Sequence, residues 1–334
     1  MTYRKVLGPI VGALVFSLAA LAQSDTSPLQ GDLYGIDRSH SILTFTVNFA
    51  GLTKVQGTFN RCRGSIFFDE KDITHSSVTV LIDVKSINTG IADRDQHLQS
   101  ADFFDAEKHS WIRFQSQRVQ KAGDGYLVAG PLTLHGVTRE VVIPFAVLSP
   151  KSSDPWGNQR VTFEGGTSLN RRDFGVVGPE FWSRAISDEV EIHLVISGRI
   201  YNFSRIGFGG GEKKSIGELL WQTVEQEGVD AARKRFHEAR QQTPSEYEFR
   251  PWDVVVVGYR LQQSGRLKEA ISILELATEA FANEPGAADA HTALAEAYAR
   301  SGDRTRAIEQ CEKTLGLNAD NTDAMELLRH LRKN

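Results

Sequence analysis

Apolar and polar side chains alternate in short runs between residues 34 and 200, and this two-residue period constrains the fold more than any other feature of the chain. The runs place apolar residues at positions 43, 45, 47 and 49, at 78, 80, 82 and 84, and at 190, 192, 194 and 196. Alternation of this kind is typical of β-strands that bury one face. Glycines between the runs, among them Gly51, Gly64 and Gly136, mark turns. Several short strands separated by turns predict an antiparallel β-sandwich or β-barrel.

Four polar signatures punctuate the strands. They read DRSHS at 37–41, DRDQHL at 93–98, LTLHGVT at 132–138 and NRRDFG at 170–175. In their order and spacing they resemble the YceI-like family, and the resemblance covers the first domain, residues 32–203, almost from end to end. One departure is Ser110, where such proteins commonly have a proline just before a strand. The resemblance implies a lipocalin-like antiparallel β-barrel that holds a long apolar lipid, typically a polyisoprenoid.

A barrel of about eight strands is either filled by its own side chains or able to hold one small or slender ligand. Alternation is the same in both cases, so the strand pattern leaves both alternatives open, and the family resemblance favours a cavity. A polyisoprenoid or a quinone would bind there by burying apolar area, which contributes about 25 cal/mol per Å². The residues expected to point inward and contact the lipid are Phe45, Val47, Val80, Ile82, Phe114, Leu132, Leu134, Ile143, Phe145 and Ile192, with Leu43 and Leu194 beside them.

The first domain is short of catalytic arrangements. It contains no Gly-x-Ser-x-Gly or His-Glu-x-x-His motif, no cysteine pair at metal spacing and no phosphate-binding glycine loop. We therefore expect neither enzyme activity nor a cofactor. The enzymatic alternative pairs His97 with Asp93 or Asp95 as acid and base, but no nucleophile accompanies them.

The charged signature residues have a structural explanation. Charged side chains in clefts usually satisfy one another, so we expect them to tie loops to the barrel mouth rather than to contact a ligand. These residues are Asp37, Asp93, Arg94, Asp95, His97, Arg172 and Asp173. An isolated histidine is also more often structural than metal-binding, so we predict no metal site. The histidines that could gather around a metal are His40, His97, His109, His135 and His193.

The tail differs in kind from the first domain. Fourteen of the 18 phenylalanines lie between Phe45 and Phe208, whereas alanine and glutamate, which favour helices, become frequent after a glycine-rich linker at 204–214. Similar segments recur 37 residues apart, with Gly265 matching Gly302 and Ala270 matching Ala307. They resemble two tetratricopeptide repeats, at about 251–284 and 288–321, within an all-α domain at 215–334.

Further helices complete that predicted domain. Helices at 215–242, broken at Gly228, extend the stack, and a segment from Thr322 to Leu331 forms a capping helix. Stacks of such repeats are mostly protein-binding surfaces, so we expect a protein partner. The linker predicts that barrel and helices fold independently. The alternative to a lipid carrier is an envelope scaffold that acts through its repeats.

The N-terminus resembles a secretory signal. Arg4 and Lys5 precede an apolar stretch at 6–21 and the small-residue site Ala20-Leu21-Ala22, which predicts a signal peptide at 1–22 and export to the periplasm or beyond. An uncleaved anchor is the alternative, but the stretch is short for a bilayer span of about 20 residues. The net charge of −4 without basic clusters argues against a nucleic-acid partner. Cys62 and Cys311 fall in different domains, which favours two unpaired cysteines.

Overall fold

The computed structural model describes residues 31–208 and 213–333. The predicted signal peptide and the centre of the predicted glycine linker lie outside the described residues. Within these ranges no helix is long and apolar enough to cross a bilayer.

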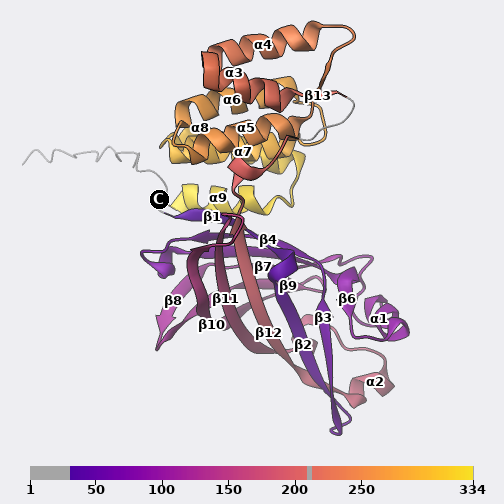
Figure 1. Ribbon diagram of the computed structural model, residues 1–334. Coiled ribbons are helices and arrows are strands. Elements are labelled where there is room, and N and C mark those ends of the chain that lie inside the picture. Colours follow the sequence, from indigo (N-terminus) through magenta and orange to yellow (C-terminus); the bar gives the residue numbers. More distant parts are fainter. Residues whose placement is uncertain (1–30, 209–212, 334) are drawn as a thin grey trace, which may run out of the picture.

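The first domain is a closed antiparallel β-barrel, as predicted (Figure 1). The ring runs β1-β4-β5-β7-β9-β10-β11-β12 and closes by pairing of β12 with β1. Its strands are β1 (Asp32–Ile36), β4 (Cys62–Phe68), β5 (Ser77–Asp83), β7 (Trp111–Gln115), β9 (Gly125–Leu134), β10 (Val137–Ser153), β11 (Gln159–Asn170) and β12 (Ile186–Ile200). Closure leaves the ring without a free edge along its length.

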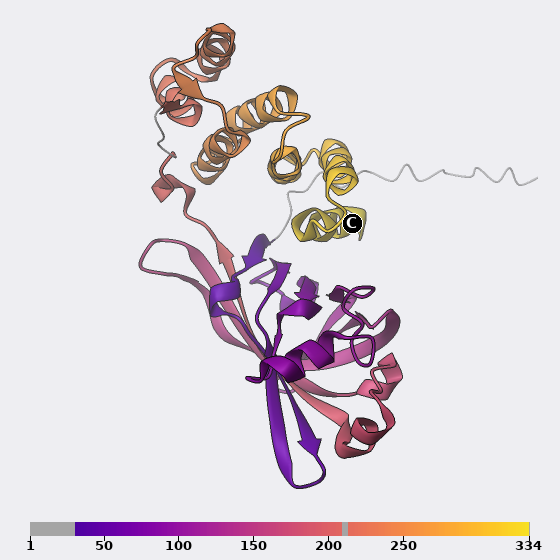
Figure 2. The same cartoon turned by 90° about the vertical axis from the view of Figure 1, so that its right-hand side faces the viewer.

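Further strands and two helices accompany the ring. β2 (Ile42–Phe49) pairs with β12, on a stretch of that strand next to the one that pairs with β1. β3 (Thr53–Phe59) and β6 (Ile87–Asn88) follow β2 in the sheet, and β8 (Arg118–Ala122) pairs with β9. Helices α1 (Ala92–Gln99) and α2 (Glu180–Ala185) lie at the same end as the β2–β3 hairpin, remote from the helical domain (Figures 1 and 2).

Strand register aligns the inward positions of neighbouring strands. Phe45 pairs with Ile192 and Leu43 with Leu194 between β2 and β12, and Val80 pairs with Phe114 between β5 and β7. Because side chains alternate along a strand, such pairs point to the same side of the wall. At the end nearer the helices Tyr34, Ile66, Phe68 and Val161 form a cluster of buried apolar side chains.

The tail consists of antiparallel helix pairs, as the repeat pattern predicted. The helices are α3 (Ile216–Glu227), α4 (Val229–Gln241), α5 (Pro251–Gln263), α6 (Leu267–Ala280), α7 (Ala287–Arg300), α8 (Arg304–Leu317) and α9 (Thr322–Lys333). The pairs α5–α6 and α7–α8 fit the two predicted repeats. Gly265 and Gly302 turn each pair at φ values of 77° and 81°, where a side chain is strained. Gly228 separates α3 from α4.

The last helix has two packing partners. One face closes the helical core through Ala324, Leu327, Leu328 and Leu331. The opposite face lies on the outer wall of the barrel at β4 and β5, between the barrel and the other helices (Figures 1 and 2). The two parts of the chain are therefore joined by a packed interface as well as by the segment between them. The cysteines are free, with Cys311 buried in the helical core.

Candidate ligand-binding cavity

The barrel encloses a cavity of about 780 Å³ with a wall of mostly aliphatic and aromatic side chains. Pockets that bind small molecules typically measure about 300–1,000 Å³ and are mostly apolar. The cavity decides between the two alternatives left open by strand alternation, because a barrel filled by its own side chains would leave no such space. Its wall draws on strands all around the ring together with α1 and α2.

The structure places all the residues predicted to point inward in the wall of this cavity. They are Phe45, Val47, Val80, Ile82, Phe114, Leu132, Leu134, Ile143, Phe145 and Ile192, with Leu43 and Leu194. Their contact with a ligand stays a prediction. The Phe45 ring lies against Gly57, where an added Cβ would come within 2.3 Å of it. The glycine therefore leaves room for this ring in the cavity wall.

Other wall residues were missed by the strand pattern. Phe103 and Phe104 come from the segment after α1, Phe174 from a single helical turn, η4 (Arg171–Phe174), and Trp182 from α2. Short helices and loops have no two-residue period that reveals which side chains point inward. Phe163 on β11 was missed because its inward neighbour two residues on is Gly165. A Cβ at that glycine would lie 2.6 Å from the carbonyl oxygen of Pro144.

Polar side chains reach the cavity at its α1 and α2 end. Arg171 is 6% exposed and donates to the carbonyl oxygens of Ser187 and Val176, both at 2.9 Å. It also donates to three further carbonyls, and it forms an ion pair with Asp188 at 3.1 Å. Burial lowers the pKa of Arg171, against the effect of the Asp188 charge. Arg171 therefore ties the loops at this end, although the sequence analysis did not single it out. Its neighbour Arg172 has the loop-tying role that was predicted, since it donates to Asp188 and, at 2.8 Å, to the Ser183 hydroxyl.

The signature around α1 is also held by its own contacts. Arg94 donates from Nε to the Thr89 hydroxyl and from Nη2 to the Thr89 carbonyl oxygen, both at 2.8 Å. Asp95 accepts from the Thr89 backbone N–H at 2.8 Å. His97 Nε2 lies 2.8 Å from Asp102, so the histidine of the enzymatic alternative is paired with neither Asp93 nor Asp95. Asp93, Arg94 and His97 nevertheless reach the cavity wall.

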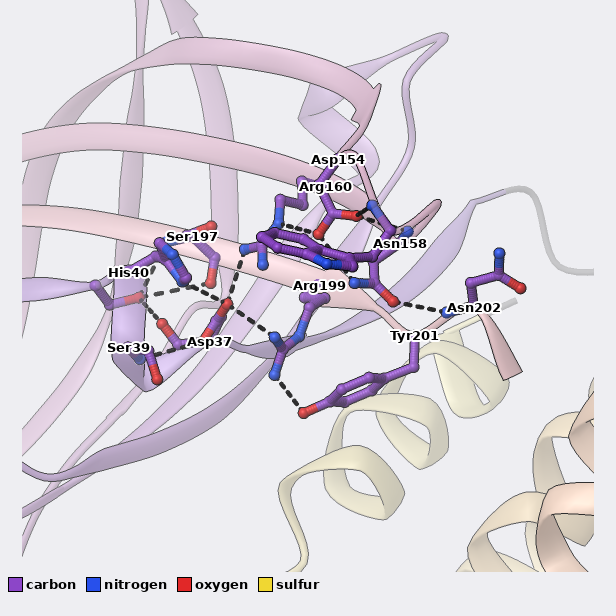
Figure 3. Close-up of polar contacts among 12 residues, drawn as sticks. Asp37, Ser39, His40, Asp154, Asn158, Arg160, Ser197, Arg199, Tyr201 and Asn202 are labelled. Atoms are coloured by element: carbon purple, nitrogen blue, oxygen red, sulfur yellow. Dashed lines mark hydrogen bonds and ion pairs between the residues drawn. The ribbon is translucent and has the colours of Figure 1, made fainter. Parts of the chain in front are cut away.

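The first signature lies at the opposite end of the barrel (Figure 3). Asp37 is 4% exposed and accepts from Arg160 at 2.7 Å and from His40 at 2.8 Å. Arg160 in turn donates to Asp154 at 2.9 Å. Burial alone would raise the pKa of Asp37, but hydrogen bonds from Arg160 and His40 outweigh it and lower the pKa. This network connects the corner between β1 and β2 to β11 and to the turn that precedes it.

The five histidines considered for a metal separate into two groups. His40, His97 and His193 each pair with a carboxylate, His193 with Glu164 at 2.8 Å. His109 and His135 instead come together, with Asp105 beside them.

These features define a class of protein: a closed antiparallel β-barrel around an apolar cavity, carrying a helical domain on its outer wall. The model of the YceI-like domain matches residues 34–197. A UPF0312 protein of Serratia proteamaculans is 36% identical over 203 residues, covering 59% of this chain and 98% of that protein. A UPF0312 protein of Yersinia pestis is 34% identical with the same coverage. The chain belongs to the YceI-like family, which confirms the resemblance in the four signatures.

Solved structures also match about half of the chain. The crystal structure of Burkholderia cenocepacia BcnA is 25% identical and covers 48% of this chain and 98% of its own, with a TM-score of 0.44. A structure described as a polyisoprenoid binding domain from Saccharophagus degradans is 19% identical, covers 50% and 98%, and has a TM-score of 0.40. The family match ends at residue 197, so the helical domain lies beyond it.

Proposed function

We propose that this protein is an exported, non-enzymatic lipid carrier that holds a polyisoprenoid or similar long apolar lipid inside the barrel. The observation that carries the proposal is the apolar cavity of about 780 Å³. Water molecules find few hydrogen-bond partners in such a space. An apolar chain, by contrast, gains about 25 cal/mol of binding free energy for each Å² of its surface that it buries. A chain without hydrogen-bonding groups fits this wall because it leaves no polar group unsatisfied.

The distribution of polar residues gives the lipid an orientation. Arg94, His97 and Arg171 reach the cavity at the α1 and α2 end, and the opposite end is packed by Tyr34 and Phe68. A polar or anionic head group therefore belongs at this end, where the positive charges of Arg94 and Arg171 attract it even though both guanidinium groups already donate to protein partners. The apolar tail extends from there toward Tyr34 and Phe68.

Exposed apolar side chains mark the proposed entrance at the same end. Trp182 lines the cavity and is 38% exposed, and Phe181 beside it is 73% exposed. The tip of the β2–β3 hairpin, with Leu52 87% exposed, is tied to α2 by a backbone hydrogen bond from Ala50 to Ala185 at 2.6 Å. Apolar groups around an opening suit the transfer of a lipid from a membrane surface.

The helical domain gives the carrier a site for a protein partner. Helix pairs stacked in this way present extended surfaces that bind proteins. The predicted signal peptide supports a location in the periplasm or outside the cell. A protein that recruits a partner but takes up no lipid would instead be an envelope scaffold acting through its repeats.

A matched pair of cavity variants tests the carrier function. Ile192→Trp adds bulk to the cavity wall, whereas His193→Trp adds similar bulk on the outer face of the same strand, where the His193 side chain is 54% exposed. Uptake of a polyisoprenoid from vesicles should fall strongly in Ile192→Trp and persist in His193→Trp. Equal uptake by both variants would place the lipid outside the barrel.

A further inference from the structure

Asp105, His109 and His135 bring three ligand atoms together beside the cavity. Asp105 and His109 belong to the segment between α1 and β7, and His135 occupies the turn between β9 and β10. Their candidate ligand atoms all lie within 4.8 Å of one another. The two imidazole rings meet edge to face with their centroids 5.0 Å apart. We infer that these three residues bind one divalent transition-metal ion, with zinc the best match.

The donor set matches zinc chemistry. Two imidazole nitrogens with one carboxylate oxygen form a three-ligand set that zinc accepts in tetrahedral geometry, with water in the fourth position. Calcium and magnesium prefer sites built from oxygen ligands, so two imidazoles disfavour them. Zinc–ligand bonds of about 2.0–2.2 Å require the three side chains to draw closer together around the ion.

A hydrogen bond prepares His135 for this role. Its Nδ1 lies 3.2 Å from the carbonyl oxygen of Phe174. A carbonyl oxygen only accepts hydrogen bonds, so Nδ1 carries the proton and Nε2 of the neutral ring keeps its lone pair. Histidines that bind metals commonly donate their other ring N–H to a carbonyl or carboxylate in this manner.

The segments also hold the side chains in place. The His109 backbone N–H donates to the Asp105 carbonyl oxygen at 2.8 Å, which closes the turn between the two ligands. The His109 ring lies over Gly136, where an added Cβ would come within 2.7 Å of it. The glycine after His135 therefore leaves room for the ring that faces it.

Lys108 competes with a metal ion for the carboxylate of Asp105. Its ammonium lies 2.8 Å from Asp105 Oδ2, and its side chain is 72% exposed. This ion pair places the lysine ammonium where a metal cation would otherwise lie beside the carboxylate. Because an exposed lysine moves away at little cost, a metal ion can take its place.

Metal binding at this position would connect three segments beside the cavity: the segment after α1, the β9–β10 turn and η4. Phe103 lines the cavity two residues before Asp105, and Phe174, whose carbonyl oxygen faces His135, lines it as well. The ion would thus join the segment after α1 to the β9–β10 turn, and through His135 to η4. This inference does not depend on which ligand the cavity holds.

Cobalt and zinc titrations of the untagged, chelator-treated full chain test the inference. We expect one equivalent of Co²⁺ to give the visible absorption of a tetrahedral site, and Zn²⁺ to displace it. Asp105→Asn and His135→Ala should each weaken binding by at least about tenfold, since even outer partners of a metal site contribute about 10–100-fold. Lys108→Met should strengthen binding, because it removes the competing ammonium.

His193→Ala is the matched control, since His193 also pairs with a carboxylate but has no third ligand among the residues that the structure describes. Its binding should equal that of the wild type. Absence of saturable binding to the wild type would overturn the inference, as would an equal loss in His193→Ala and His135→Ala. Circular dichroism checks that the variants are folded. If the ligand variants do not fold, the metal affinity of Lys108→Met tests the inference instead. An affinity equal to that of the wild type would mean that the metal does not bind at Asp105.

Discussion

Glu326 on the last helix accepts a hydrogen bond from Thr79 on the outer wall of the barrel, with Thr79 Oγ1 2.6 Å from Glu326 Oε2. The Glu326 side chain is fully buried and also accepts from Ser77 and Arg329. A carboxylate without solvent is stable only when such donors surround it. The prediction of independently folding domains considered the linker alone, and this interface supplies a second connection.

Removing Glu326 should loosen the helical domain from the barrel. Glu326→Ala leaves Arg329, which is 14% exposed, without its buried partner, and breaking a buried ion pair typically costs about 3–5 kcal/mol. Chemical denaturation should show this loss, together with faster proteolysis near residues 204–214. Glu312→Ala removes an exposed pair with Arg332 and should cost at most about 1 kcal/mol. Equal effects of the two variants would mean that the interface adds nothing.

Phe45→Ala should change ligand retention more than stability. Phe45 faces the cavity, so truncation enlarges a space that already exists, and the free energy of unfolding should fall by well under the usual cost of about 3–5 kcal/mol. Phe68→Ala is the control, because Phe68 is buried in the apolar cluster with Tyr34 and Val161 and should incur that full cost. A large loss of stability in Phe45→Ala with unchanged lipid binding would contradict the carrier.

Polar substitutions at the entrance should slow lipid uptake from membranes. Leu52→Asp with Phe181→Asp replaces two exposed apolar side chains at the far end of the barrel, so the folded state should be little affected. Transfer of a polyisoprenoid from vesicles should slow at least several-fold. Trp156→Asp changes a residue that is 65% exposed in the turn between β10 and β11, and should leave the rate unchanged. The flanking residues Asp154 and Asn158 lie in the network at the opposite end of the barrel (Figure 3). Slowing by all these variants alike would exclude a defined entrance.

Glu296 should make stability depend on pH. Burial, with the nearby Asp323 charge, raises the pKa of Glu296 to about 7 from an ordinary 4.5, against the effects of Arg300 and the Tyr259 hydrogen bond. Between these values the folded state binds more protons than the unfolded chain, so its stabilising contribution is lost as pH rises from about 4.5 to about 7. Denaturation at several pH values should show a smaller decline in Glu296→Gln. Identical pH profiles would show that Glu296 titrates normally.

The sequence was most informative where periodicity reports burial. Phe45 and Ile192 were assigned to the interior because every second residue of a strand faces the same way, and pairing then set them side by side. Trp182 was missed because a six-residue helix has too few turns for a period to emerge. The size of the cavity was likewise out of reach, since alternation is identical in filled and hollow barrels.

Contacts between distant segments were the other limit. From the sequence pattern alone, Glu326 and Thr79 would both be predicted to face solvent, because each lies on the polar side of its own helix or strand. In the structure they instead form a hydrogen bond with each other. Only the arrangement of the two domains turns these polar faces toward one another. Asp105 and His135 are brought together in the same way, by the packing of the segment after α1 against the β9–β10 turn.

Native mass spectrometry followed by organic extraction tests the central claim most directly. The chain is produced with its N-terminal segment and purified without denaturant, alongside Ile192→Trp and His193→Trp. The carrier function predicts that the wild type and His193→Trp carry the added mass of an apolar, extractable lipid, and that Ile192→Trp carries much less. A wild-type protein that is bare, and that takes up no polyisoprenoid from vesicles, would contradict it.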